Sequence, residues 1–90
     1  MGTGSGVFIK FSQEFATGYY AGDGFCALIF AEASRLIEER GAVPSLYQNG
    51  KDLSISTVGV MQEEPLKQLI TQINALKDEA HRDIFEVVVR

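Results

Sequence analysis

The sequence has no tryptophan, two prolines, one cysteine (Cys26) and one histidine (His81) in 90 residues. One cysteine cannot form a disulfide within the chain, and a zinc site built from cysteine and histidine needs about four such ligands. We therefore expect no bound metal ion, no cofactor, and a reducing, cytoplasmic setting. No apolar run approaches the roughly 20 residues of a membrane-spanning helix. This argues against a membrane protein.

Basic residues are also scarce. Eight Lys and Arg stand against twelve Asp and Glu, which gives a formal net charge of −4 and a pI of about 4.8. Binding to nucleic acid or to an anionic membrane depends on clustered basic side chains, and here they are scattered singly. The sequence predicts neither partner.

The overall composition is that of an ordinary globular domain, with 46% hydrophobic and 22% charged residues. A chain of this length has room for a single core. The first six residues, "MGTGSG", carry no apolar side chain after Met1. We expect residues 1–6 to form a flexible leader and residues 7–90 to form one α+β domain.

The first half of the domain mixes one clear pattern with one ambiguous one. Val7, Ile9 and Phe11 alternate with less apolar neighbours and predict a strand over about residues 6–12. The polar, glycine-bearing residues 13–23 are interpreted as a loop. Apolar residues then recur at helical spacing over about 24–40, with a possible cap at Asp23. The predicted apolar stripe of that helix is Phe25, Leu28, Ile29, Ala33, Leu36 and Ile37. In a rival interpretation, "AGDG" is a hairpin turn and "FCALIF" a strand.

The second half gives firmer patterns. Asn49-Gly50 lies between two extended segments and predicts a tight two-residue hairpin turn. Glu63, Glu64 and Pro65 suit the first turn of a helix. The apolar stripe of that helix is Leu66, Leu69, Ile70, Ile73, Leu76 and Ala80. A final strand, "IFEVVV", follows. The predicted fold is a two-layer, ferredoxin-like βαββαβ sandwich, with two helices on one face of a four-stranded antiparallel sheet.

The stretch "TGYYAGDGF" is the candidate binding site. Glycines before a helix can present backbone N–H groups to an anion, but the stretch matches neither a Walker loop nor a dinucleotide fingerprint. Tyrosines can stack on a planar ligand or anchor a partner. The candidate residues are Tyr19, Tyr20, Gly22, Asp23 and Gly24. The competing interpretation is that Asp23 caps a helix and that a tyrosine covers the core.

Catalytic residues are not evident. Cys26 lies in the first turn of the predicted helix, where the helix dipole can activate a thiol, and His81 is the only histidine that could act as its base. A cysteine within "GFCALIF" is more typical of a small buried apolar residue, and His81 is typical of a solvated residue at a helix C-terminus. We therefore predict no catalytic residue.

The strings "YAGDGF", "LSISTVGV" and "PLKQLITQINALKDEA" resemble the second half of the nucleotide-cyclase palm of GGDEF and type III CRISPR effector proteins. In that palm, a Gly-Gly-Asp-acid hairpin precedes a strand and a helix. The resemblance covers about residues 19–80 and implies a hairpin at "AGDG". Gly24 replaces the second acidic residue of the family, and no earlier strand supplies the other metal-binding aspartate. The resemblance thus implies a catalytically degenerate palm.

Three functions follow as expectations. The first is a non-enzymatic protein-interaction or regulatory domain, with the Tyr-rich loop and the acidic helix surfaces as contact regions and with open sheet edges that pair in a homodimer. The second is a sensor that binds a nucleotide or an amino acid through residues 17–24. An enzyme, or a degenerate cyclase palm, comes third, because no set of residues specifies a reaction.

Overall fold

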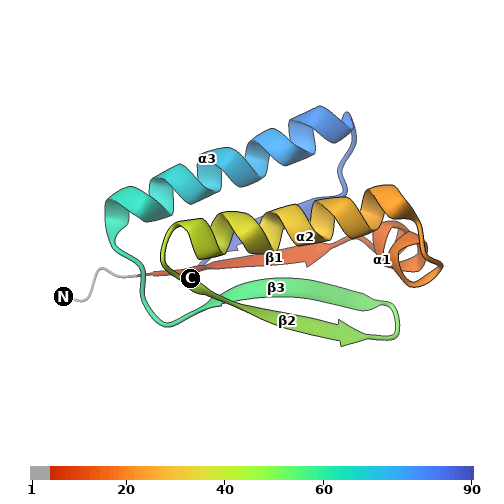
Figure 1. The fold of residues 1–90 in the computed structure, drawn as a ribbon, viewed down its shortest axis with the longest axis horizontal. Coiled ribbons are helices and arrows are strands. Elements are labelled where there is room, and N and C mark those ends of the chain that lie inside the picture. Colours follow the sequence, from red (N-terminus) through yellow and green to blue (C-terminus); the bar gives the residue numbers. More distant parts are fainter. Residues whose placement is uncertain (1–4) are drawn as a thin grey trace.

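The computed structural model describes residues 5–90 as an α+β domain with seven helices and strands (Figure 1). In chain order they are β1 (Val7–Phe11), α1 (Gln13–Tyr20), α2 (Gly24–Glu39), β2 (Val43–Asn49), β3 (Asp52–Val58), α3 (Glu63–Ala80) and β4 (Phe85–Val89). The four strands form one antiparallel sheet in the order β2-β3-β1-β4. The predicted α+β class and four-stranded antiparallel sheet are confirmed.

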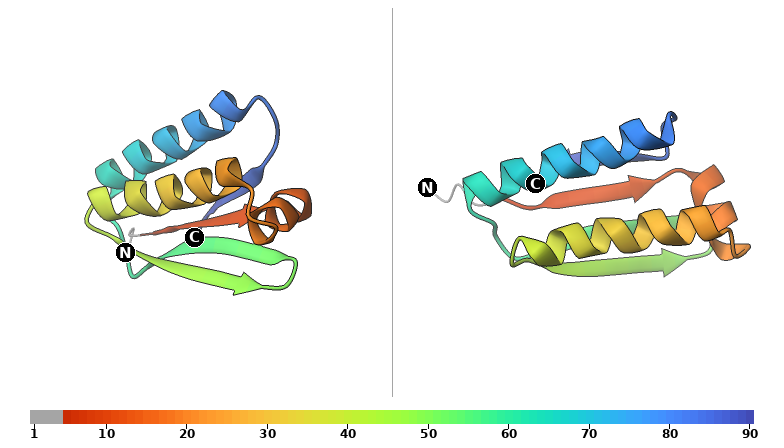
Figure 2. Two further views of the ribbon diagram at one scale, coloured as in Figure 1. Left: turned by 45° about the vertical axis from the view of Figure 1, so that its right-hand side comes forward. Right: turned by 45° about the horizontal axis from the view of Figure 1, so that its top comes forward.

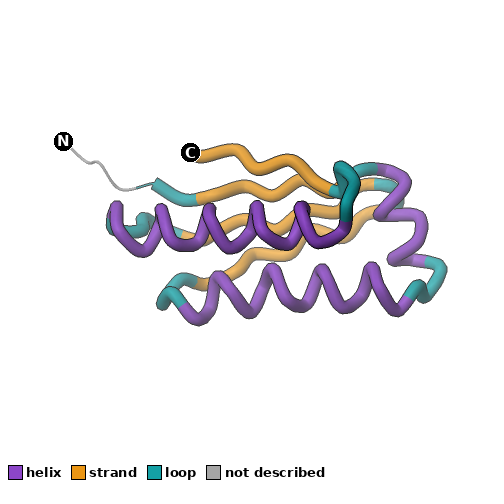
Figure 3. The backbone as a smooth tube through the Cα atoms, turned by 90° about the horizontal axis from the view of Figure 1, so that it is seen from above, coloured by secondary structure: helices purple, strands orange, loops and turns teal. Residues whose placement is uncertain are grey.

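The two long helices cover the same face of the sheet, and the short helix α1 lies at one end of it. In Figure 1 and the left view of Figure 2, α2 and α3 run above the strands, and the view from above in Figure 3 places both helices in front of the sheet. No described helix covers the opposite face. The core is therefore one layer thick, between the sheet and the two long helices.

Strand β1 lies in the interior of the sheet, and its side chains alternate between the two faces. Val7, Ile9 and Phe11 are at most 2% exposed and face the helices. The strand pairs with both β3 and β4, so that Ile9 lies opposite Ile55 on one side and Val87 on the other. Residues that lie directly opposite each other point to the same face of the sheet. The alternation in β1 therefore determines which residues of β3 and β4 face the helices.

Helix α2 forms as the helical spacing predicts, and the rival hairpin interpretation is wrong. Phe25 and Leu28 of the predicted stripe are exposed, and Cys26 and Phe30 are buried in their place. The buried stripe is Cys26, Ile29, Phe30, Ala33, Leu36 and Ile37. Asp23 caps the first turn through its side chain. The helix ends at Glu39, and Gly41 follows with a positive φ of 80°, as a C-terminal glycine stop does. Because residues 25–30 are helical, the hairpin implied by the palm resemblance is absent.

The loop expected over residues 13–23 is largely wrong, because residues 13–20 form helix α1. The Ser12 side chain accepts a hydrogen bond from the backbone N–H of Phe15 at 3.1 Å and so caps the helix. Only Phe15 and Ala16 are buried in this helix. Two adjacent buried residues give no helical spacing in the sequence. The available signal was Ser12, a residue type that is favoured at the N-cap of a helix.

The β2–β3 hairpin is confirmed, but its turn lies one residue later than expected. Asn49 pairs with Asp52, so the two turn residues are Gly50 and Lys51. Gly50 has a φ of 61°, while Asn49 and Lys51 have negative φ. A positive φ at the first turn residue alone is the pattern of a type II′ turn, which requires glycine at that position.

Helix α3 begins with Glu63 and Glu64 and has Pro65 in its first turn, as predicted. Leu66, Leu69, Ile73 and Leu76 are buried, and Ile70 and Ala80 pack against the core, which confirms the predicted stripe. The helix ends at His81, whose φ of 57° is the only positive value at a non-glycine residue between residues 5 and 90.

Both ends of the described chain join the sheet. Gly6 and Arg90 exchange two backbone hydrogen bonds of 2.8 and 2.9 Å, which extend the β1–β4 ladder. The N–H of Met61 donates to the carbonyl of Ser5 at 2.8 Å. Of the expected leader, residues 1–4 lie outside the described residues. Within residues 5–90, every helix is too short or too polar to cross a membrane.

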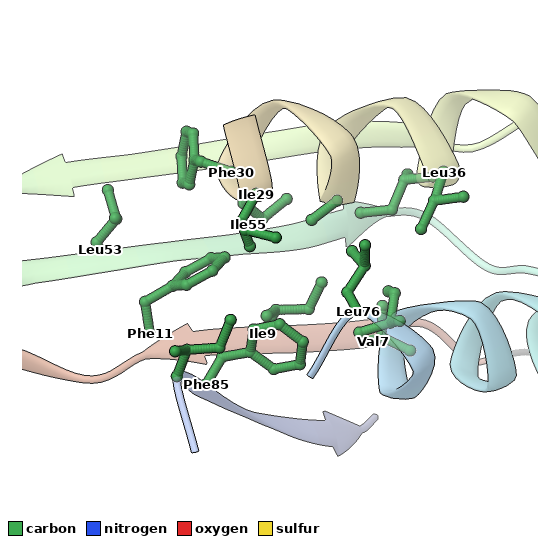
Figure 4. Close-up of a cluster of buried hydrophobic side chains, with 14 of the residues drawn as sticks. Val7, Ile9, Phe11, Ile29, Phe30, Leu36, Leu53, Ile55, Leu76 and Phe85 are labelled. Carbon is green, nitrogen blue, oxygen red and sulfur yellow. The ribbon is translucent and has the colours of Figure 1, made fainter. Parts of the chain in front are cut away.

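Phe11 is the centre of an aromatic cluster that joins β1 to three other elements (Figure 4). Its ring lies 4.6 Å from that of Phe15 on α1, 5.5 Å from that of Phe30 on α2 and 5.4 Å from that of Phe85 on β4. Figure 4 shows the side chains of Phe11, Phe30 and Phe85 directed into the same space. This cluster holds the short helix α1 against the core.

We predict that Phe11→Ala lowers the free energy of unfolding by about 3–5 kcal/mol, because it opens a cavity between four elements. That loss can exceed the stability of a small domain, so Phe11→Leu, with an expected loss of about 1–3 kcal/mol, is the quantitative variant. Urea unfolding followed by circular dichroism measures both.

The control is Phe25→Leu on α2. Phe25 is 43% exposed, so this change should alter the free energy of unfolding by less than about 0.5 kcal/mol. Equal losses at the two positions would contradict this packing.

Candidate functional site

The two tyrosines of the candidate stretch fasten α1 to the β2–β3 hairpin. The ring of Tyr19 packs 4.8 Å from that of Phe30, and its hydroxyl donates to Gln48 Oε1 at 3.4 Å. Tyr20 is 45% exposed, and its hydroxyl donates to the Asp52 carbonyl at 3.3 Å. Partial desolvation is the larger cause of a raised pKa at the Tyr20 hydroxyl, and Tyr19 and Asp52 add to it. Both side chains therefore have contacts within the chain.

Asp23 lies at the start of α2 and acts as its N-cap. Its Oδ1 accepts hydrogen bonds from the N–H of Phe25 at 2.8 Å and from that of Cys26 at 3.2 Å. Gly22 turns the chain between α1 and α2 with a φ of 89°, a conformation that favours glycine. Gly24 is the first residue of α2. The carboxylate thus occupies the N–H groups that an anion would otherwise use.

The structure brings Tyr19 and Tyr20 together, whereas the Asp23 side chain caps helix α2. The two rings meet edge to face at 5.4 Å, next to the hairpin, whereas Gly22, Asp23 and Gly24 form the corner between the helices. A binding role for the five residues stays a prediction. Their internal contacts supply a structural role for Tyr19, Tyr20 and Asp23.

We predict that Asp23→Ala lowers the free energy of unfolding by about 1 kcal/mol, because two backbone N–H groups lose their acceptor. For a domain of this size, that loss lowers the melting temperature by roughly 4–8 °C. Asp23→Asn retains an oxygen acceptor and should restore most of the stability. Asp78→Ala, on the exposed part of α3, is the control and should stay within about 0.5 kcal/mol of the parent protein. An unchanged melting temperature for Asp23→Ala would rule out the cap.

Cys26 is a buried residue of the core, with 3% of its surface exposed. Burial, followed by the nearby Asp23 carboxylate, raises the pKa of the Cys26 thiol, and Arg82 opposes the shift. His81 is exposed at the far end of α3, where its backbone N–H donates to the Asp78 carbonyl at 3.1 Å. The Cys26 environment is thus that of a structural thiol.

We predict that an aromatic disulfide reagent modifies Cys26 far more slowly in the folded protein than in urea-unfolded protein at the same pH. The raised pKa lowers the thiolate fraction, and burial blocks access. The modification rate should be proportional to the fraction of molecules in which unfolding exposes Cys26. Destabilising variants such as Phe11→Leu raise that fraction and should therefore accelerate the modification. A rate in the folded protein equal to that of a free thiol would show that Cys26 is accessible.

The helix-free face of the sheet is a larger candidate surface, and sequence patterns did not indicate it. The register places two rows of side chains on this face. One row, across the four strands, is Ser45, Ser56, Phe8 and Val88, and the next is Tyr47, Ser54, Lys10 and Glu86. Val43 and Val58 are paired beside the first row. The sequence signal for this face was the presence of large apolar or aromatic residues, Phe8, Tyr47 and Val88, at positions that point away from the helices.

This face is partly apolar and only partly protected. Tyr47 is 52% exposed, Val58 is 58% exposed and Val88 is 43% exposed. Phe8 is half-buried, since the Arg90 guanidinium lies over its ring at 4.4 Å. Solvent-facing apolar side chains are common singly, but several on one flat sheet face are typical of a contact surface.

Charge is divided unevenly between the two layers. Ten of the twelve acidic residues and five of the eight basic residues lie on the helices and their connecting loops, which gives that layer a formal charge of −5. The strands, the β2–β3 turn and Arg90 hold the other three basic and two acidic residues, a formal charge of +1. The acidic character of the chain thus belongs to the helical side.

No model of a known protein family matches the chain, and no curated protein matches it closely enough to indicate a relative. Among residues 5–90, no three His, Cys, Asp or Glu side chains are grouped as metal ligands. The geometry of the described surface is therefore the remaining basis for inferring a function.

Proposed function

We propose that this chain is a ferredoxin-like, non-enzymatic interaction domain that self-associates through the helix-free face of its sheet. The observation that carries the proposal is the first row on that face, Ser45, Ser56, Phe8 and Val88, which is bulky over β1 and β4 and shallow over β2 and β3. The cytoplasmic setting belongs to the same proposal, and the single buried thiol of Cys26 supports it.

The ferredoxin-like assignment is supported by the order of the elements. Strand β1 leads through α2 to β2, the β2–β3 hairpin follows, and α3 returns the chain to β4 beside β1. Both long helices cover one face of the sheet (Figure 3). In this description, α1 is an addition between β1 and α2. The fold alone does not define a function. The function is therefore inferred from the helix-free face of the sheet.

The shape of the helix-free face supports a second copy of the same chain as the partner. In the first row, Phe8 and Val88 project from one half of the sheet, while Ser45 and Ser56 leave the other half low. A two-fold axis parallel to the strands would place the bulky half of one copy over the low half of the other. Such self-complementarity is what a symmetric dimer interface requires.

The second row gives a matching polar pattern. The same axis places Glu86 of one copy over Tyr47 of the other, a residue that is 52% exposed, and Lys10 over Ser54, which is only 8% exposed. Glu86 then meets an exposed residue with a hydroxyl group at the contact. Contact between two helical layers, each with a formal charge of −5, would instead bring like charges together.

The sheet edges, expected as the dimer contact, are the outer sides of β2 and β4. Strand β2 has Pro44 near its start, which removes one backbone donor, and β4 has five residues. An edge contact would use only one short strand per copy. The face offers four strands at once, so we prefer it to the edges.

We predict that Ser45→Arg and Val88→Lys each weaken self-association by roughly tenfold or more, because each places a long charged side chain within the contact. Ser45 is exposed and Val88 is 43% exposed, so the fold should tolerate both changes. Sedimentation equilibrium over a range of protein concentrations measures the dissociation constant.

The matched control is Leu28→Lys on α2, at a side chain that is 58% exposed on the helical layer. It should leave the dissociation constant unchanged. A monomeric parent protein at every concentration would reject self-association. A loss for Leu28→Lys equal to that for Val88→Lys would place the contact on the helices.

A further inference from the structure

A cavity of about 430 Å³ lies at the end of the sheet where β1 ends and β4 begins. The β2–β3 turn and the last turns of α3 also contribute to its wall. None of residues 17–24 lines it. It is therefore distinct from the stretch that the sequence favoured as a ligand site.

Charged side chains of both signs surround this cavity. Three of the four lysines in the chain line it, namely Lys10, Lys51 and Lys77. Three carboxylates line it as well, Asp52, Asp83 and Glu86. These six residues come from four separate segments of the sequence, and the fold brings them to one place.

None of the six charged groups forms an ion pair within 4.0 Å of another described residue. Lys10 and Glu86 lie directly opposite each other on β1 and β4 and still do not pair. By contrast, Arg35 on α2 holds two carboxylates, Glu32 and Glu39. The charges around the cavity are thus arranged about a shared space and not as closed pairs.

Phe11 and Phe85 lie at the base of the cavity, where both are almost fully buried, at 2% and 4% exposed. The Lys77 ammonium lies 5.9 Å from the centre of the Phe85 ring. Ser12 and Gln13 add a hydroxyl and an amide. A ligand pocket commonly combines an apolar wall with a few polar groups that fix orientation.

We propose that this cavity binds a small zwitterion of the free amino-acid class, with its carboxylate toward the lysines and its ammonium toward the carboxylates. The six charges sum to zero, so a ligand with one charge of each sign finds groups of opposite charge for both of its ends and leaves the cavity neutral. A phosphate or a dicarboxylate would meet the three carboxylates as like charges. Lys10 and Glu86 also belong to the proposed dimer contact, whereas Lys51, Asp52, Lys77 and Asp83 lie outside it, so the cavity is tested through residues of this second group.

The first experiment is isothermal titration calorimetry of the parent protein with each free L-amino acid at about 10 mM, a concentration that fills most of any millimolar site. For each amino acid that binds, the N-acetyl derivative, which lacks the ammonium, and the amide, which lacks the carboxylate, are titrated next. Inorganic phosphate is titrated in parallel. We expect the free amino acid to bind at least tenfold more tightly than either derivative, and phosphate not to bind.

The second experiment removes charges away from the helix-free face, so that its outcome is separate from that of self-association. Lys51→Met with Lys77→Met should weaken amino-acid binding by roughly tenfold or more, and Asp83→Asn should weaken it as well, because charge-assisted hydrogen bonds are lost. Lys67→Met changes the fourth lysine, outside the cavity, and should have no effect. The sedimentation behaviour of all these variants should match that of the parent protein.

Three results would overturn the proposal. The first is no heat of binding with any free amino acid. The second is equal binding of the N-acetyl derivative or of phosphate, which would make the cavity an anion site. The third is binding that the Lys67→Met control weakens as much as the double lysine variant does.

Discussion

The placement of both long helices on one face of the sheet is the constraint on which the rest of the molecule depends. It requires β1 to present Val7, Ile9 and Phe11 to the helices, and it fixes the opposite face as the position of Phe8 and Lys10. Because neighbouring strands follow the register of β1, the outward residues of all four strands meet on one uncovered surface. The core and the helix-free face are thus two consequences of one alternation.

The same constraint explains how charge and packing are distributed. Acidic side chains gather on the solvent faces of the helices, where they keep the helical layer in water and oppose contact with a second helical layer. The sheet face is close to neutral and carries its apolar side chains between hydroxyl groups. At the end of the sheet, where strands, turn and helix α3 converge, charges of both signs surround a cavity.

Sequence patterns were sufficient where one segment carries the whole signal. The stripe from Leu66 to Leu76, the alternation of β1 and the Asp23 cap of α2 each depend on residues close in sequence. Helix α1 was missed because only two adjacent residues of it are buried, and the hairpin turn shifted by one residue because strand pairing, not the Asn-Gly dipeptide, sets the register. The two-row face and the six charges around the cavity join distant segments, so no local pattern contains them.

The central claim is that two copies meet through the helix-free faces of their sheets. An isotope-filtered nuclear Overhauser experiment tests it most directly, on an equimolar mixture of ¹³C-labelled and unlabelled protein at a concentration where the dimer predominates. The account predicts intermolecular contacts between Val88 methyl groups and the β-protons of Ser45, with none at Leu28. Intermolecular contacts that involve Leu28 and Phe25 on α2, without any at Val88, would contradict it.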